Sequence, residues 1–254
     1  KVTKSGITTD YGYKEYLDGS AVIPGEALNT FYSYKYDRLD ANGLPTFKDI
    51  EETDGITQTE MFAKVFAYSG TRIPDITGGF GTDISYKNLA IRGFFSYSLG
   101  TKIRLNNLYN DSGQRLPQPQ QNMNQAFVNR WKQPGDENRT DIPVLTTDPL
   151  DMYGLGIDRK IKIADNGWEM YNKSDLRVAS GNYLRLKNLY VRYNFSDRIC
   201  HKIRAQMISV RFEATNLWLL ADKKLKGQDP EQVTLGGVST PPTSSYTLGL
   251  DITF

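Results

Sequence analysis

The sequence has few of the residues on which most catalytic and metal-binding chemistry depends. It contains one cysteine and one histidine in 254 residues. A single cysteine excludes an internal disulfide framework, and a single histidine leaves a Ser-His-Asp triad only one base. Cys200 and His201 are neighbours, but the sequence around them supplies neither an oxyanion hole nor a second pair of metal ligands. We therefore predict no catalytic residue, no metal site and no cofactor.

Long apolar runs and an excess of charge are also missing. The longest apolar run covers about Leu217 to Ala221, far short of the roughly 20 residues of a membrane helix, so a spanning helix is excluded. The mean hydropathy of −0.52 would fit a soluble protein. That inference is unsafe, because a transmembrane β-strand needs apolar residues only at alternate positions over about 9 to 11 residues. The net charge of +2 does not favour a nucleic-acid partner.

What the chain has instead is glycine, aromatics and alternation. Its 22 glycines, 16 tyrosines and 11 phenylalanines favour sheet over helix. The terminal SYTLGLDITF and the earlier QMISVRFEATN are apolar at every second position, which is the periodicity of a β-strand with one oily face. In a membrane barrel these strands predict the following lipid-facing residues: Ile208, Val210, Phe212, Tyr246, Leu248, Leu250, Ile252 and Phe254.

Two further stretches read as strands. GGFGTDISYKNLAIRGFFSYSLG predicts a hairpin around the two-residue turn Lys87-Asn88, with Phe94 as the one large apolar residue on the polar face. NYLRLKNLYVRYNF predicts a strand whose first half is mixed, because Arg185 and Lys187 share the phase of Leu189. Either the strand leaves the apolar slab there or a bulge changes its face.

The connections between these strands alternate in length. They comprise the two residues 87–88, about 76 residues (106–181), ten residues (196–205) and 29 residues (217–245). All short turns therefore lie at one end of the sheet and all long loops at the other, as in outer-membrane barrels with short periplasmic turns and long extracellular loops. A soluble sandwich has no reason to follow this rule. Five strands cannot close a wide barrel alone, so either more strands lie elsewhere or the chain is a piece of a larger one.

The long loops carry the only candidates for ligand contact. QNMNQAFVNRW predicts a one-sided helix with Met123, Phe127 and Trp131 on one face, and ADNGW predicts a turn at Asn166-Gly167. The loop aromatics are candidates for stacking on sugar rings or gripping peptide side chains, or else they pack the loops or contact a partner protein. These aromatic candidates are Tyr109, Trp131, Tyr153, Trp168 and Trp218.

Several stretches together are similar to one family, the SusC-type TonB-dependent transporters of Bacteroidetes outer membranes. They are LNTFYSYKYDRLDANGLPTF, YSGTRIPDITGGFGTDISYKNLAIRGFFSYSLG, NRWKQPGDENRTDIP, NYLRLKNLYVRYNF, ATNLWLLADKKLKGQDPE and TLGLDITF. One departure is Arg38, where members of the family commonly have glycine. The resemblance implies an all-β, antiparallel, plugged transmembrane barrel of about 22 strands, with residues 1–254 as its C-terminal portion. The plug domain and signal peptide would then lie outside these residues.

The resemblance also implies a function. The whole protein would be an outer-membrane nutrient importer of Gram-negative cells and not an enzyme. It would take up oligosaccharides or peptides, with a SusD-like surface lipoprotein as lid and with energy supplied by TonB through the plug. The residues themselves leave a second hypothesis open, a secreted all-β ligand-binding module. A barrel segment should need detergent in solution, whereas such a module should not.

Overall fold

The structure is a computed structural model of the 254-residue chain. It describes residues 2, 11–49, 58–109, 117, 122–145, 165–233 and 240–254. The chain divides into two compact units. Unit 1 comprises residues 1–73 and 102–179, and unit 2 comprises residues 74–101 and 180–254.

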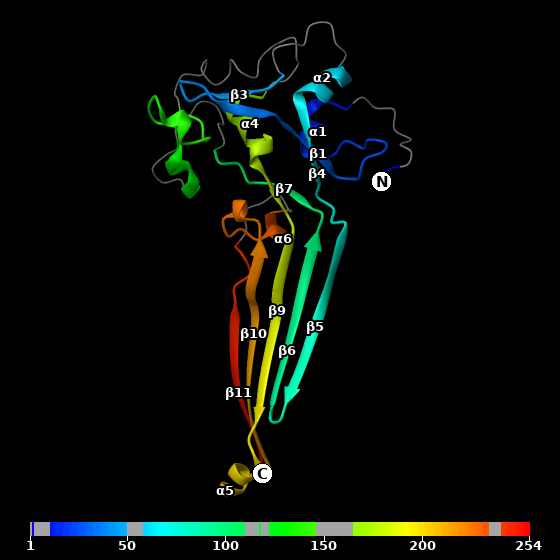
Figure 1. Cartoon of the computed structure of the whole chain (residues 1–254), viewed down its shortest axis with the longest axis vertical. Coiled ribbons are helices and arrows are strands. Elements are labelled where there is room, and N and C mark those ends of the chain that lie inside the picture. Colours follow the sequence, from blue (N-terminus) through cyan, green and yellow to red (C-terminus); the bar gives the residue numbers. More distant parts are fainter. Residues whose placement is uncertain are drawn as a thin grey trace. The chain divides into compact units, whose positions relative to one another are not determined.

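Unit 2 is built on one antiparallel sheet of five strands in the order β11-β10-β9-β6-β5 (Figure 1). The strands are β5 (Ile76–Tyr86), β6 (Leu89–Leu99), β9 (Tyr183–Asn194), β10 (Met207–Ala221) and β11 (Ser245–Thr253). Each strand pairs with the next long strand along the chain, so the sheet is an up-and-down meander. The antiparallel all-β architecture expected for these segments is confirmed.

The connections of unit 2 follow the expected alternation. Tyr86 pairs with Leu89, so the β5-β6 turn is the predicted two-residue one, with Lys87 at a positive φ of 52°. At the same end of the sheet, β9 and β10 are joined through the short helix α5 (Asp197–Lys202). Cys200, Ala205 and Ile208 form a small buried cluster there, and Phe195 packs against it. His201, beside Cys200, is exposed.

Two register shifts lie in the middle of the sheet, and the one between β6 and β9 changes the face on which the side chains of β9 lie. Against β6, the residues facing Phe94 and Phe95 are Asn188 and Leu186, so β9 carries one extra residue at Lys187. The sequence left open whether the strand leaves the apolar slab or a bulge changes its face. The bulge is present, and it puts Arg185 on the polar face. A second register shift lies between Thr215 and Trp218 of β10.

The long loop predicted over residues 217–245 begins later than expected. Strand β10 continues to Ala221, so Trp218 is a strand residue and not a loop aromatic. The loop itself holds the 3₁₀ helix η4 (Lys223–Leu225) and the helix α6 (Pro230–Val233). Strand propensity explains the difference, because Leu217, Trp218 and Leu219 suit a pleated, half-buried surface.

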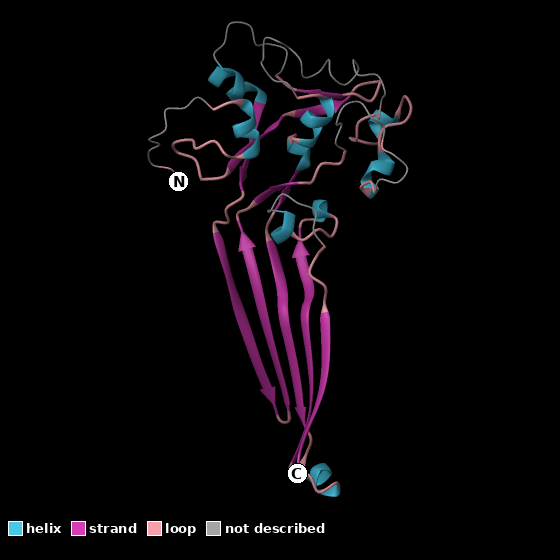
Figure 2. Cartoon of the chain, turned by 180° about the vertical axis from the view of Figure 1, so that it is seen from behind, coloured by secondary structure: helices cyan, strands magenta, loops and turns pink. Residues whose placement is uncertain are grey.

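Unit 1 consists of short strands and short helices (Figure 2). Its strands are β1 (Thr30–Tyr34), β2 (Tyr36–Leu39), β3 (Pro45–Phe47), β4 (Phe66–Thr71) and β7 (Lys102–Arg104), and β7 pairs with β8 (Val178–Ser180). Its described helices are α1 (Tyr13–Asp18), α2 (Gln58–Val65), α4 (Gly167–Asn172) and the 3₁₀ helices η1 (Gln125–Asn129), η2 (Asp136–Asn138) and η3 (Asp175–Arg177). The sequence did not reveal these short strands, because none is long enough to show alternation.

Two apolar clusters hold unit 1 together. The first contains Leu17, Tyr34, Met61, Phe62, Val65, Phe66 and Met170. The second contains Leu108, Tyr109, Ala126, Phe127, Trp168 and Tyr171. All residues of the second cluster belong to the long connection between β6 and β9. This connection therefore has a packed core, in which the aromatic side chains of the cluster are shielded from water.

Local hydrogen bonds overrule two expectations in unit 1. The predicted one-sided helix is the five-residue 3₁₀ helix η1, capped by the Asn124 side chain, although Phe127 and Trp131 are buried as the spacing indicated. Asn166-Gly167 is not a free-standing turn. Asn166 is the N-cap of α4 and forms a capping box with Glu169, which redirects the chain into a helix.

The turn between β2 and β3 contains Asn42 and Gly43 and depends on Gly43. Gly43 has a φ of 78°, and an added Cβ would lie 2.4 Å from the Trp131 ring. Gly25 also has a positive φ, 89°, but no described residue lies within 4 Å of such a Cβ. Gly25→Ala should therefore report the backbone strain alone, about 1 kcal/mol. Gly43→Ala should cost more, because the ring must move as well. Thermal unfolding followed by tryptophan fluorescence measures both, and equal losses would contradict the close contact.

Candidate functional site

The sheet of unit 2 has one face that is apolar and exposed. Residues directly opposite each other on paired strands share a face, so the register assigns the face of each side chain. The exposed large residues on the apolar face are Ile76, Phe80, Ile84, Tyr86, Leu99, Tyr193, Trp218, Leu220, Tyr246, Leu248, Leu250 and Ile252. An apolar surface of this extent indicates a partner or a membrane rather than water.

The residues of β10 and β11 that were predicted to face lipid fall on this apolar face, with different exposures. Leu248 and Leu250 of β11 are 76% and 62% exposed. Phe254 follows β11 and is also exposed, whereas Val210 and Phe212 are half-buried. Ile208 differs, because it is buried in the cluster beneath α5 and is only 7% exposed.

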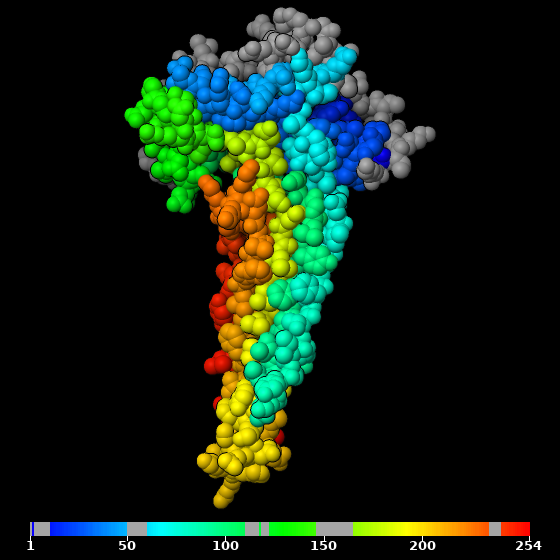
Figure 3. Space-filling view, in the orientation of Figure 1, coloured from blue at the N-terminus to red at the C-terminus, as the bar shows by residue number. Residues whose placement is uncertain are grey.

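The opposite face of the sheet is polar and carries ion pairs. The strands of the sheet lie side by side in Figure 3, from β5 in cyan to β11 in red. The Nε of Arg92 lies 2.7 Å from the Oδ2 of Asp83, directly across the β5-β6 pair. Arg211 and Asp251 form a looser pair at 3.7 Å, with Arg211 Nη1 as the cation. Such a face needs water or polar protein against it, because unpaired charges in an apolar medium are costly.

Phe94, the apolar exception on the polar face, is accommodated by glycine. A Cβ at Gly79 would lie 2.8 Å from the Cζ of Phe94, so the ring lies over that bare stretch of backbone. Glycine at this position therefore makes room for the ring.

The aromatic residues that were candidates for substrate contact are mostly core residues. Tyr109 and Trp168 belong to the second apolar cluster, with their rings 5.3 Å apart. Trp131 is 9% exposed, and its indole Nε1 donates to Glu137. The alternative that these side chains pack the loops therefore holds for these three. Tyr153 lies outside the described residues.

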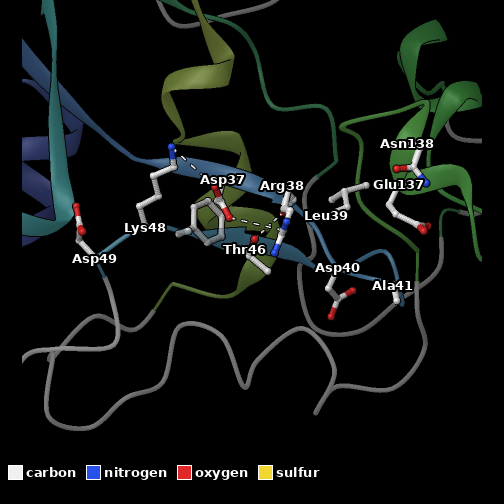
Figure 4. Close-up of a pocket in the computed structure, with 11 residues that line it drawn as sticks. Asp37, Arg38, Leu39, Asp40, Ala41, Thr46, Lys48, Asp49, Glu137 and Asn138 are labelled. Carbon is white, nitrogen blue, oxygen red and sulfur yellow. Dashed lines mark hydrogen bonds and ion pairs between the residues drawn. The ribbon is translucent and has the colours of Figure 1, made fainter.

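Unit 1 also carries an open groove of about 890 Å³. In Figure 4, residues from β2, the turn after it and β3 line one part, and Glu137 and Asn138 of η2 line another. Charged side chains of both signs border it, namely Asp37, Arg38, Asp40, Lys48, Asp49 and Glu137. Sequence reasoning did not find this groove, because its two parts are about a hundred residues apart in the chain.

The carboxylates of the groove are held by local hydrogen bonds. Asp40 accepts from the backbone N–H groups of Asn42 and Leu44, both at 2.8 Å, which fixes the turn. A hydrogen bond and the charge of Lys35 hold the pKa of Asp49 below its usual value. The indole hydrogen bond from Trp131 is the main cause that lowers the pKa of Glu137. The groove is thus a polar surface with fixed geometry.

A buried arginine ties the strands of unit 1 to α1. Arg104 donates from Nη1 to the carbonyl of Leu17 at 2.6 Å and from Nη2 to the Ser33 hydroxyl at 3.0 Å. Its guanidinium lies 5.0 Å from the centre of the Phe31 ring. Burial lowers the pKa of Arg104 to about 10, so it remains charged at neutral pH. No local sequence signal marks this contact, because its partners lie more than 70 residues away.

Across the described residues, none of the helices has the length and apolar character needed to cross a membrane. In the same part of the chain, no group of three or more His, Cys, Asp and Glu side chains is placed to hold a metal ion.

Comparison with known proteins gives relatives of one kind. No family model matches the chain. The TonB-dependent receptor P3 of Formosa agariphila is 27% identical in an alignment that covers 91% of this chain and 22% of that receptor. The TonB-dependent receptor P26 of the same organism is 26% identical, over 92% of this chain and 23% of its own length. The chain is related to TonB-dependent receptors. The resemblance seen in the sequence is confirmed, and the chain spans less than a quarter of these relatives.

Solved structures agree on the fold. The structure described as the RagAB peptide transporter has a TM-score of 0.56 and 23% identity, covering 89% of this chain and 23% of that chain. The RagAB peptide importer in its 'open-open' state gives a TM-score of 0.53 with the same identity, over 89% of this chain and 22% of its own. The relatives and neighbours are thus named as receptors or transporters.

The hydrogen bond between Trp131 and Glu137 predicts a titration in acid. The carboxylate of Glu137 accepts this bond, so the bond is present above the lowered pKa and is lost as the pH falls through it. We expect a change in tryptophan fluorescence with a midpoint below the ordinary glutamate value of 4.5. Glu137→Gln should remove this transition. A transition that persists in the variant would assign it to another group.

Proposed function

We propose that this chain is part of the wall and loops of an outer-membrane, TonB-dependent nutrient importer. Residues 1–254 would be the C-terminal portion of a plugged barrel of about 22 strands, with the plug domain and signal peptide elsewhere in the protein. The observation that carries the proposal is the five-stranded meander with one exposed apolar face and alternating short and long connections. The kinship to TonB-dependent receptors supports it.

In this proposal the apolar face contacts lipid and the polar face lines the lumen. A bilayer offers no hydrogen-bonding partners, so only closed barrels and helices satisfy their backbone groups within it. The edge strands β5 and β11 would therefore pair with further strands of the same protein. The ion pairs Asp83–Arg92 and Arg211–Asp251 would be solvated by water or by the polar surface of the plug.

The connections set the direction of the chain across the membrane. The β5-β6 turn and the segment with α5 lie at one end of the sheet, and we assign this end to the periplasm. The β6-β9 connection and the loop after β10 would then be extracellular. The packed clusters of unit 1 would give that surface a fixed shape.

Peptides or oligosaccharides are the proposed cargo. The solved structures with this fold are described as a peptide importer or transporter, which favours peptides. A SusD-like lipoprotein would act as lid, and TonB would deliver energy through the plug. We propose no enzymatic step, and the membrane-anchored importer is preferred over a secreted binding module because the apolar face is too large for a water-exposed sheet.

The assignment of faces is tested by two arginine substitutions on β11. Leu250 lies on the apolar face, and Leu250→Arg should cost about 2–4 kcal/mol in a bilayer. Thr247 lies on the polar face opposite Glu213, so Thr247→Arg should cost much less, about 0–1 kcal/mol. Urea unfolding of the full protein folded into lipid vesicles measures both. Equal costs would contradict the two-faced assignment.

The transport role is tested in cells of the source organism. Disruption of the gene should abolish uptake of a labelled peptide mixture or of labelled oligosaccharides, and the class that is lost identifies the cargo. Import by a TonB-dependent protein requires an energised inner membrane, so a protonophore should stop uptake while surface binding persists. The intact protein should also need detergent to stay in solution. A detergent-free, monomeric protein that binds ligand would favour the secreted module.

A further inference from the structure

The first part of the loop after β10 lies against the polar face of the sheet. We call residues 222–233 the strap; it contains η4 and α6. Among the described sheet residues, it contacts Arg185 and Tyr183 of β9 through their polar groups. Both face the polar side because of the bulge at Lys187, and Arg185 pairs in register with Ser96 of β6.

One buried ion pair joins the strap to the sheet. The Nη2 of Arg185 lies 2.5 Å from the Oδ2 of Asp229, and the two side chains are 5% and 2% exposed. Glu231 adds a second carboxylate at 3.4 Å from the same nitrogen and accepts a hydrogen bond from the Tyr183 hydroxyl. The Oδ1 of Asp229 accepts from the Glu231 backbone N–H at 3.0 Å, which holds the two carboxylates together.

Smaller contacts hold the two ends of the strap. At its start, the Oδ2 of Asp222 accepts from the Ser180 backbone N–H at 2.8 Å. Leu225, Pro230 and Val233 are buried. These contacts position the strap, but Arg185 is its one charged attachment to the sheet among the described ion pairs.

Several buried polar atoms oppose this closed position. Among the described residues, the Nε of Arg185, the Ser96 hydroxyl and the side-chain oxygens of Gln228 and Gln232 are buried and have no hydrogen-bond partner. A buried polar atom without a partner is unfavourable, and each of these would regain hydrogen bonds to water if the strap lifted. In addition, Asp229 pairs with the Nη2 of Arg185 and not with its Nε. A carboxylate in the bidentate geometry would accept hydrogen bonds from both nitrogens.

A buried ion pair of this kind stabilises little in total, because desolvation of both charges offsets their attraction. Loss of one partner is nevertheless strongly destabilising, since the other charge is left buried and unpaired.

We propose that the strap is poised to open from the polar face of the sheet and that the Arg185–Asp229–Glu231 cluster is the fastener that keeps it closed. This device goes beyond the proposed transport function and does not require it.

The test uses the accessibility of Val233, which is 6% exposed while the strap is closed. The protein as its gene encodes it, purified in detergent, carries Val233→Cys in a Cys200→Ala background, and its labelling rate with a charged maleimide is measured. Arg185→Met and Asp229→Asn should each raise this rate about tenfold or more, because each leaves a buried charge unpaired. Arg211→Met is the matched control, since it removes an exposed ion pair on the same face and should leave the rate unchanged.

The double variant Arg185→Met/Asp229→Asn completes a double-mutant cycle. If the two residues act as one fastener, it should label no faster than the faster single variant. Parent-like labelling in the single variants would overturn the proposal and assign closure to apolar packing. A double-variant rate equal to the product of the two single effects would overturn it too. If Arg185→Met does not fold, Asp229→Asn against Arg211→Met decides the question.

Discussion

Backbone pairing between the five long strands of unit 2 is the constraint on which most of its other features depend. Side chains alternate strictly along a strand, so the register decides the face of each residue. In the observed register, Val210 pairs with Leu250 and Phe212 with Leu248. A slip of one residue would move Arg211 onto the apolar face and Val210 onto the polar one. The apolar face, the ion pairs and the proposed lipid contact all follow from this one register.

The bulge at Lys187 shows how the sheet keeps its two faces where the sequence does not alternate. Without it, Arg185 would share the face of Leu189. With it, Leu184 and Leu186 join the apolar face, and Arg185 meets Asp229 of the strap. The extra residue at Lys187 thus keeps the apolar side chains on one face and the charged side chain on the other. It also creates the buried, incompletely satisfied cluster from which we infer that the strap can open.

The β6-β9 connection is an unusual loop because it contributes to a core. Long connections without structure are costly to order and are uncommon in compact domains. Here Trp168, Tyr109 and Phe127 pack in one cluster, and Arg104 binds the carbonyl of Leu17 and the hydroxyl of Ser33. The groove between β2, β3 and η2 is therefore presented by a fixed framework. Such a surface needs little ordering on binding.

The sequence by itself determined the features that have a short period. Alternation in residues 246–254, the two-residue turn at Lys87-Asn88 and the lengths of the connections all predict the meander, because strand geometry is local. Tertiary structure decided the rest. The bulge choice at Arg185, the capping of α4 by Asn166 and the burial of Trp131 depend on which alternative packs and hydrogen-bonds best. Partners such as Arg185 and Asp229 are 44 residues apart, and only the fold brings them together.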